Sequence, residues 1–173
     1  MAHFYIVLSK FYFLFYFEDG NSKRYMNQAQ TVVLLADDDE DDCFLFKEAL
    51  DELPLNTSLL IVNNGLQLMS FLEKANELPD VLFLDMNMPC MNGLECLKQI
   101  RIQDLYKELI VIIYTTSYDK DLAKTLKNLG ADFYIRKPSE FSTLKIIINK
   151  TLQIIGKTGE FHPKPNTFML SED

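Results

Sequence analysis

The 173-residue chain is poor in cysteine, and its three cysteines match no CxxC or Cys/His spacing typical of a metal site. We therefore expect Cys43, Cys90 and Cys96 to be reduced thiols, as in a cytosolic protein, rather than parts of a disulfide framework. Basic residues are also scarce, since 17 Lys and Arg stand against 25 Asp and Glu and give a net charge of −8. General nucleic-acid binding needs a basic patch, so this balance predicts no nucleic acid among the partners.

The sequence also lacks an apolar run long enough to cross a membrane. The aromatic stretch near the N-terminus is interrupted by Lys10 and falls short of the about 20 apolar residues that a span needs. It has neither the basic start nor the small-residue cleavage site of a signal peptide. Three interpretations of residues 1–27 remain open: a membrane-surface anchor, an extra strand, or a stretch that is not natural protein, with translation starting at Met26. We expect a cytoplasmic protein in which residues 1–27 are a doubtful N-terminal extension.

What the chain does have is a series of short apolar runs, each followed by polar residues and then by apolar residues at helical spacing. Such runs predict strands buried on both faces of a parallel sheet, and the spacing predicts helices between them. Five strand–helix units in sequence predict an α/β domain, a doubly wound five-stranded parallel sheet with helices on both faces. We place this domain at 28–156 and a flexible tail at 157–173. The expected strands are 31–36, 57–62, 81–84, 109–114 and 132–136, and the helices follow at about 43–53, 66–74, 94–102, 119–129 and 139–155.

Polar side chains stand at the carboxyl ends of four of these strands: Asp37 and Asp38, then Asp85, Thr115 and Lys137. The carboxyl ends of parallel strands share one edge of a sheet, so we expect these residues in one crevice. Three carboxylates placed together repel, and Mg²⁺, which prefers oxygen ligands, would remove that repulsion. The hydroxyl and the ammonium group could hold the remaining oxygens of a phosphoryl group, toward which an Asp carboxylate is a known nucleophile.

Four segments at these strand ends resemble the receiver domain of two-component response regulators, the CheY-like superfamily. The resemblance covers residues 31–155 and implies a flavodoxin-like (βα)5 fold with strand order 2-1-3-4-5. It further implies a single-domain response regulator, a signalling protein that assists its own phosphoryl transfer and slow dephosphorylation rather than an ordinary enzyme. The segments are Leu34-Leu35-Ala36-Asp37-Asp38-Asp39, Leu84-Asp85-Met86-Asn87-Met88-Pro89 with Asn92-Gly93, Ile113-Tyr114-Thr115-Thr116-Ser117, and Tyr134-Ile135-Arg136-Lys137-Pro138.

The same resemblance implies an acceptor residue and a metal site. Asp85 would accept the phosphoryl group from the phosphohistidine of a sensor histidine kinase or of a phosphotransfer protein. Asp38 would bind Mg²⁺ directly and Asp37 through water, and Asn87 would contribute its backbone carbonyl.

It also implies a switch. Thr115 would turn toward the acyl phosphate, and Tyr134 would swing inward behind it. Lys137 would pair with a phosphoryl oxygen, and its peptide bond to Pro138 is expected to be cis. The responding surface would comprise the fourth helix, the fifth strand and the fifth helix, where a downstream partner or a second copy of the chain would bind. Three consecutive isoleucines of that helix cannot all face one sheet, so we expect Ile146 to lie partly outside the core.

Other functions on related folds remain as alternatives. A phosphohydrolase with an Asp nucleophile generally carries a second Asp two positions on, where this chain has Asn87. A flavin-binding module needs a phosphate loop after the first strand, but residues 37–42 are all acidic there and would repel a phosphate unless a metal intervened. A receiver used only for docking normally lacks an acidic residue or the lysine, and none is missing. We interpret residues 39–42 as a solvated helix start.

Overall fold

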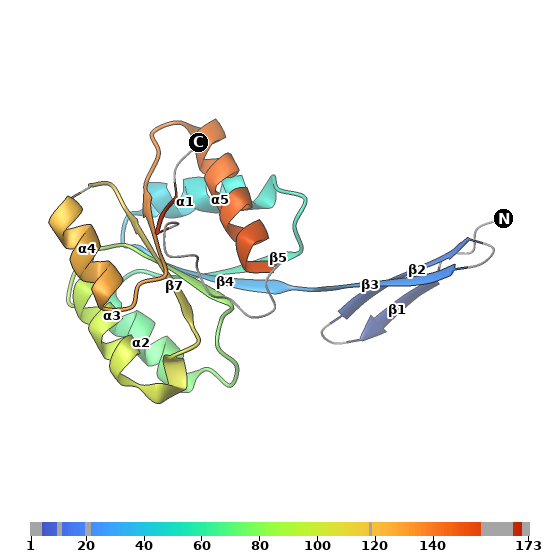
Figure 1. Ribbon diagram of the computed structural model, residues 1–173, viewed down its shortest axis with the longest axis horizontal. Helices are drawn as coiled ribbons and strands as arrows, with labels where there is room; N and C mark the ends of the chain where they lie inside the picture. The colour runs from blue at the N-terminus through green and yellow to red at the C-terminus, as the bar shows by residue number, and fades with distance from the viewer. Residues whose placement is uncertain (1–4, 10–11, 20–21, 118, 157–167, 171–173) are drawn as a thin grey trace.

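The computed structural model describes residues 5–9, 12–19, 22–117, 119–156 and 168–170, and its described strands form two separate sheets (Figure 1). The first is antiparallel and has the order β1-β2-β3, and the second is parallel and has the order β5-β4-β6-β7-β8-β9. The elements are β1 (Tyr5–Ser9), β2 (Tyr12–Asp19), β3 (Ser22–Ala29), β4 (Thr31–Ala36), α1 (Glu40–Asp51), β5 (Thr57–Val62), α2 (Gly65–Lys74), β6 (Val81–Leu84), α3 (Gly93–Ile102), a 3-10 turn (Asp104–Tyr106), β7 (Ile110–Thr115), α4 (Lys120–Asn128), β8 (Phe133–Arg136), α5 (Phe141–Gly156) and β9 (Met169–Leu170).

The parallel sheet confirms the fold expected from the sequence. Its first five strands have the order β5-β4-β6-β7-β8, which is the order 2-1-3-4-5 counted along the domain. The sheet is one strand larger than expected, because Met169–Leu170 pair in parallel with β8. We expected no regular structure after residue 156. A two-residue strand is too short to leave a periodic pattern in the sequence, and residues 157–167 and 171–173 lie outside the described part of the chain.

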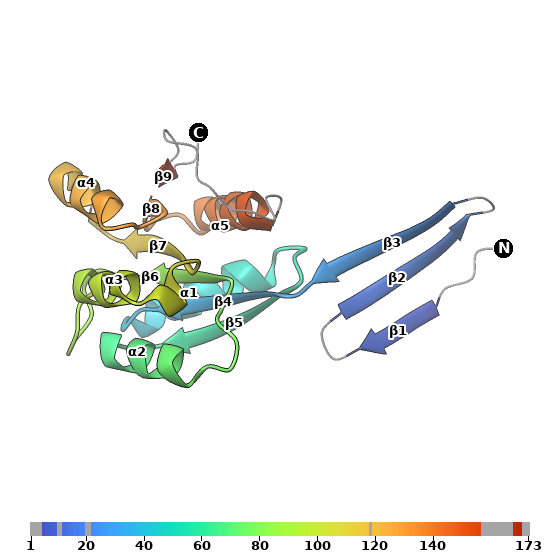
Figure 2. The same ribbon diagram turned by 60° about the horizontal axis from the view of Figure 1, so that its bottom comes forward.

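Helices cover both faces of this sheet and divide the core into two clusters. Leu68, Leu97 and Leu126 bring α2, α3 and α4 onto one face, and Phe46 and Ile148 bring α1 and α5 onto the other. Figure 2 shows the same division. Because side chains alternate along a strand, successive residues of each central strand serve opposite clusters, which is why these strands read as continuous apolar runs. The central strands β6 and β7 are thus buried on both faces, whereas Leu60 and Ile61 of the edge strand β5 stay exposed.

Ile146 lies outside this core, as its position among three consecutive isoleucines predicted. Its side chain is 54% exposed, while Ile147 and Ile148 are buried at 4% and 0%. The result follows from helical geometry, because consecutive residues point in different directions around the axis.

The N-terminal strands pair with one another in antiparallel register and not with the parallel sheet. Among the three interpretations of residues 1–27, an extra strand comes nearest, but the described residues of the segment form three strands, and β3 runs across the boundary expected at residue 27. A translation start at Met26 stays a prediction. Within the described residues, no helix combines the length and the apolar character that crossing a bilayer requires.

Candidate functional site

Backbone hydrogen bonds hold the carboxyl ends of the central strands side by side. They extend the strand pairing by one residue into the loops, so the first loop residues are fixed by the sheet rather than by their own conformational preference. The bonds run from Asp37 N–H to Val62 O at 3.0 Å, from Asp85 N–H to Ala36 O at 2.9 Å and from Lys137 N–H to Thr115 O at 2.8 Å. The polar residues predicted at four strand ends therefore share one edge of the sheet.

Three carboxylates meet at this edge. Asp37, Asp38 and Asp85 each offer an oxygen, and the three oxygens lie within 4.8 Å of one another. Asp37 and Asp85 are buried, with 0% and 4% exposed, whereas Asp38 is exposed. An all-oxygen donor set with one solvent-facing member suits Mg²⁺, which binds few protein ligands and keeps several waters. The residues present therefore fit the predicted metal.

The loop after β6 fixes the orientation of the Asp85 carboxylate. Its Oδ2 accepts a hydrogen bond from the backbone N–H of Asn87 at 2.9 Å. Asn92 then starts α3, accepting from Glu95 N–H while the Glu95 side chain accepts from Asn92 N–H, as in a capping box. The predicted metal-binding role of the Asn87 carbonyl stays a prediction.

Lys137 brings a cation into the acidic cluster. Its Nζ lies 2.7 Å from Asp37 Oδ2, 2.7 Å from Asp42 Oδ2 and 3.6 Å from Asp85 Oδ1, and its side chain is only 7% exposed. Burial alone would lower the pKa of Lys137, but the contacts with Asp37 and Asp42 outweigh it and raise that pKa above its ordinary value. Lys137 is therefore held as a cation next to Asp85.

Asp37 is the most deeply buried of these carboxylates. Burial raises the pKa of Asp37 above its usual value, although the neighbouring Lys137 opposes the shift. Its Oδ2 receives no well-directed hydrogen bond from the described residues, so its contact with Lys137 is an ion pair. Lys137 therefore supplies the charge compensation that a buried carboxylate needs.

Asp42 is a site residue that sequence reasoning missed. The acidic run 39–42 predicts a solvated helix start, an interpretation that fits Asp39, which caps α1 by accepting from two backbone N–H groups. Asp42 instead accepts a hydrogen bond from the ammonium group of Lys137, 95 residues away in the chain. Helical spacing does not single Asp42 out, because Asp39 precedes the buried residues Cys43 and Phe46 by the same four and seven positions that separate Asp42 from Phe46 and Ala49.

Thr115 and Tyr134, the two predicted switch residues, are both buried at 0% exposure. The Thr115 hydroxyl finds no hydrogen-bond partner among the described residues. Tyr134 donates its hydroxyl proton to Ser117 O at 2.6 Å, so its ring already lies inside the protein. A buried hydroxyl without a partner costs free energy, which makes Thr115 the residue here that gains most from a new acceptor. Their switching role stays a prediction.

One predicted detail of the site is wrong. The peptide bond between Lys137 and Pro138 is trans, since the described residues contain no cis bond. The trans form is the intrinsically preferred isomer even before proline, and the Lys137 side chain reaches the carboxylates from it.

Gly93, the first residue of α3, gives a direct test of how tightly the loop between β6 and α3 is packed. A Cβ at this position would overlap the carbonyl oxygen of Asp85, whereas a Cβ at Gly156 would meet nothing within 4 Å. We expect Gly93→Ala to lower the free energy of unfolding by about 1–3 kcal/mol, the usual cost of overpacking. The matched control, Gly156→Ala, should not lower it. Urea unfolding of both variants measures the difference, and equal effects would show that the loop yields without cost.

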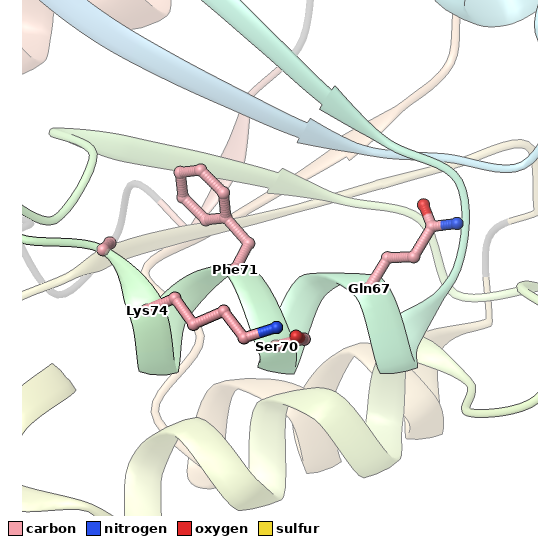
Figure 3. Close-up of a pocket in the computed structure, with 5 residues that line it drawn as sticks. Gln67, Ser70, Phe71 and Lys74 are labelled. Atoms are coloured by element: carbon pink, nitrogen blue, oxygen red, sulfur yellow. The ribbon is translucent and has the colours of Figure 1, made fainter.

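A shallow hollow of about 340 Å³ lies elsewhere, on the surface of α2. Its lining comes from that helix and its end, and Figure 3 shows Gln67, Ser70, Phe71 and Lys74 rising from α2. None of the strand-end carboxylates contributes to it. The acidic cluster with its lysine is therefore the candidate site, and the hollow is a separate surface feature.

Comparisons with known proteins agree with this geometry. Residues 33–149 match the family described as the response regulator receiver domain. Sensor histidine kinase CheAY of Helicobacter pylori is 27% identical over 139 residues, which are 80% of this chain but only 17% of CheAY. Response regulator Rcp1 of Synechocystis is 30% identical over 118 residues, which are 65% of this chain and 80% of Rcp1.

Solved structures show the same fold. The phosphorylated cyanobacterial phytochrome response regulator RcpA superimposes with a TM-score of 0.70 at 26% identity, over 76% of this chain and 98% of RcpA. The Mn²⁺-bound form of Rcp1 gives a TM-score of 0.68 at 26% identity, over 76% of this chain and 99% of Rcp1. The strand order, the carboxylate cluster at the strand ends and the family match lead to one conclusion: this chain belongs to the response regulator receiver domain family of two-component signalling.

Proposed function

We propose that Asp85 accepts a phosphoryl group from the phosphohistidine of a sensor histidine kinase or a phosphotransfer protein. The observation that carries the proposal is the position of Lys137, whose ammonium group lies 3.6 Å from Asp85 Oδ1 within a cluster of carboxylates. A solved relative, RcpA, is a phosphorylated response regulator, and another relative is named a sporulation initiation phosphotransferase. Both names fit transfer of a phosphoryl group, which we now extend to this chain.

In this proposal Asp85 acts as the nucleophile. One of its oxygens is held by the Asn87 N–H, and the other faces Lys137. That second oxygen forms the new bond to phosphorus while the bond from phosphorus to the donor imidazole nitrogen breaks, leaving the donor histidine free. Lys137 balances the charge that spreads over the phosphoryl oxygens as the bond changes.

Asp37, Asp38 and Asp85, with the carbonyl of Asn87, would hold Mg²⁺. When bound, the cation neutralises charge on the phosphoryl oxygens. The amide side chain of Asn87 cannot deliver a proton to a departing group, so the chain has no general acid at that position, and we expect slow dephosphorylation. The protein then acts as a signalling switch rather than as a hydrolase.

The switch follows from the buried hydroxyl of Thr115. A phosphoryl oxygen on Asp85 would give this hydroxyl the acceptor it lacks, and a shift of Thr115 would move the segment up to Ser117. Tyr134 is tied to that segment through its bond to Ser117 O, so it would respond. The change would reach the surface formed by α4, β8 and α5, where a downstream protein or a second copy of the chain would bind.

Acetyl phosphate, a small phosphoryl donor, tests the proposal directly. With Mg²⁺ we expect intact-mass spectrometry of the full chain to show one added phosphoryl group, and with EDTA in place of Mg²⁺ none. Uptake that is equal under the two conditions would contradict a metal-assisted acceptor, and no uptake from several small donors would contradict acceptance on Asp85.

Metal affinity should distinguish the two carboxylates after β4. We expect Asp38→Ala to weaken Mg²⁺ binding more than Asp37→Ala, because Asp38 faces solvent and Asp37 already pairs with Lys137. Asp41→Ala, which removes an exposed carboxylate from the same acidic run, is the matched control and should have little effect. Isothermal titration with Mg²⁺ measures all three, and equal losses for Asp37 and Asp38 would contradict the assigned roles.

A further inference from the structure

The outer edge of the parallel sheet is closed by a segment from the far end of the chain. Met169–Leu170 form β9, which pairs with Tyr134 and Ile135 of β8. Figure 2 shows β9 outside β8, between α4 and α5. The chain's own C-terminal segment, Phe168–Leu170, therefore lies on the surface that the proposed function assigns to output.

Side chains of this segment bind on both sides of the sheet edge. The Phe168 ring packs against the Tyr134 ring with 6.2 Å between centroids, and the Lys127 ammonium of α4 lies 5.6 Å from the Phe168 ring centre. Leu170 is only 5% exposed and belongs to the core cluster beneath α1 and α5. Met169 between them is 43% exposed. The edge thus accepts an aromatic and an aliphatic side chain two positions apart.

Backbone bonding shows what kind of ligand this edge takes. The N–H of Tyr134 donates to Phe168 O at 2.7 Å, so the segment pairs with the backbone of the edge strand β8. Adding an extended segment to an exposed edge is a recurring mode of protein recognition, in which backbone bonds supply affinity and side-chain pockets supply specificity. A two-residue strand makes few such bonds, so it can leave at low cost compared with unfolding of the core.

We infer that Phe168–Leu170 is a built-in competitor for the β8 edge. The segment occupies a strand-accepting surface, and it must leave before a partner can add an extended segment with the same aromatic-x-aliphatic pattern. The inference rests on the proposed function only in identifying this face as the output surface. Tyr134 connects the β8 edge with the loop after Thr115, because its N–H donates to Phe168 O and its hydroxyl donates to Ser117 O.

Two substitutions in the full chain separate the segment's buried contact from its exposed one. Leu170→Asp places a charge in the core cluster and should release the segment, whereas Met169→Asp alters a side chain that already faces solvent. In an amide hydrogen-exchange experiment followed by NMR, we expect exchange at Tyr134 N–H to rise by at least about tenfold in Leu170→Asp, which corresponds to about 1.4 kcal/mol. Met169→Asp should exchange as the unaltered chain does.

Competition is then measured with a synthetic peptide of residues 165–173, titrated to millimolar concentration against each protein. In Leu170→Asp the Tyr134 amide signal should shift saturably with peptide concentration. In the unaltered chain the apparent affinity for the peptide should be at least about tenfold weaker, because a tethered competitor has an effective concentration on the order of millimolar. Phe168→Ala provides a second released variant in case Leu170→Asp unfolds, and it should bind the peptide likewise.

Equal peptide binding by the unaltered and released chains would overturn the inference, and so would unchanged Tyr134 exchange in both released variants. Exchange that becomes faster on dilution of the unaltered chain would show that a second copy supplies the strand, which also overturns an internal competitor. No phosphoryl group takes part in these measurements. Their failure would therefore leave acceptance on Asp85 standing, and failure of acetyl phosphate uptake would leave the competitor standing.

Discussion

The Asp85→Asn variant should take up no phosphoryl group from acetyl phosphate in the presence of Mg²⁺. The change replaces one carboxylate oxygen by an amide nitrogen of similar size, so it removes the proposed nucleophile and one proposed metal ligand while keeping the shape of the side chain. Asp85 stands at the end of the central strand β6, where the Asn87 N–H binds one of its oxygens and the other lies 3.6 Å from Lys137 Nζ. Intact-mass spectrometry after a fixed incubation gives the result.

Asp121→Asn is the matched control, because Asp121 is an exposed carboxylate in the first turn of α4. It should take up the phosphoryl group to the same extent as the unaltered chain. Circular dichroism would establish that both variants are folded. Full uptake by a folded Asp85→Asn variant would move the acceptor to another carboxylate, and Asp42 would be the first to examine because it also contacts Lys137.

Most of the site could be predicted because a buried parallel strand leaves a simple mark in the sequence. The apolar run Val81–Leu84 ends where the strand ends, so Asp85 had to emerge at the carboxyl edge. The same argument placed Asp37 after β4 and Thr115 at the end of β7. Parallel strands with right-handed crossovers align those ends, and convergence of the polar residues then follows from topology rather than from any single contact.

Asp42 as a site residue and strand β9 were not predicted, because neither leaves a comparable pattern in the sequence. Asp42 belongs to an acidic run in which every member suits the positive end of a helix dipole, and composition alone does not tell the one that turns inward from its neighbours. Strand β9 has two residues, too few for a periodicity, and its partner is more than thirty positions earlier in the chain, at Tyr134 and Ile135. Both features depend on tertiary contacts with β8 and the loop after it, which sequence-local reasoning does not reach.

Lys137→Met should strongly destabilise the protein in the absence of divalent metal. The ammonium group lies among Asp37, Asp42 and Asp85, and its side chain is 7% exposed. Methionine keeps much of the apolar stem but removes the only cation that the structure places against these carboxylates within its described residues. Removing one partner of a buried ion pair typically costs about 3–5 kcal/mol, because the remaining charge stays buried without compensation. Urea unfolding in EDTA measures this loss.

Mg²⁺ should restore part of that stability, and more of it in Lys137→Met than in the unaltered chain. A ligand that binds only the folded state stabilises it by a free energy that increases with the logarithm of its affinity, and the cluster without its lysine attracts a cation more strongly. Lys47→Met is the control, because Lys47 pairs with Asp51 on the exposed face of α1 and should show neither the loss nor the Mg²⁺-dependent gain. If Lys137→Met were as stable as that control in EDTA, the ammonium group would not be what holds the acidic cluster together, and the charge balance proposed for phosphoryl transfer would lose its support.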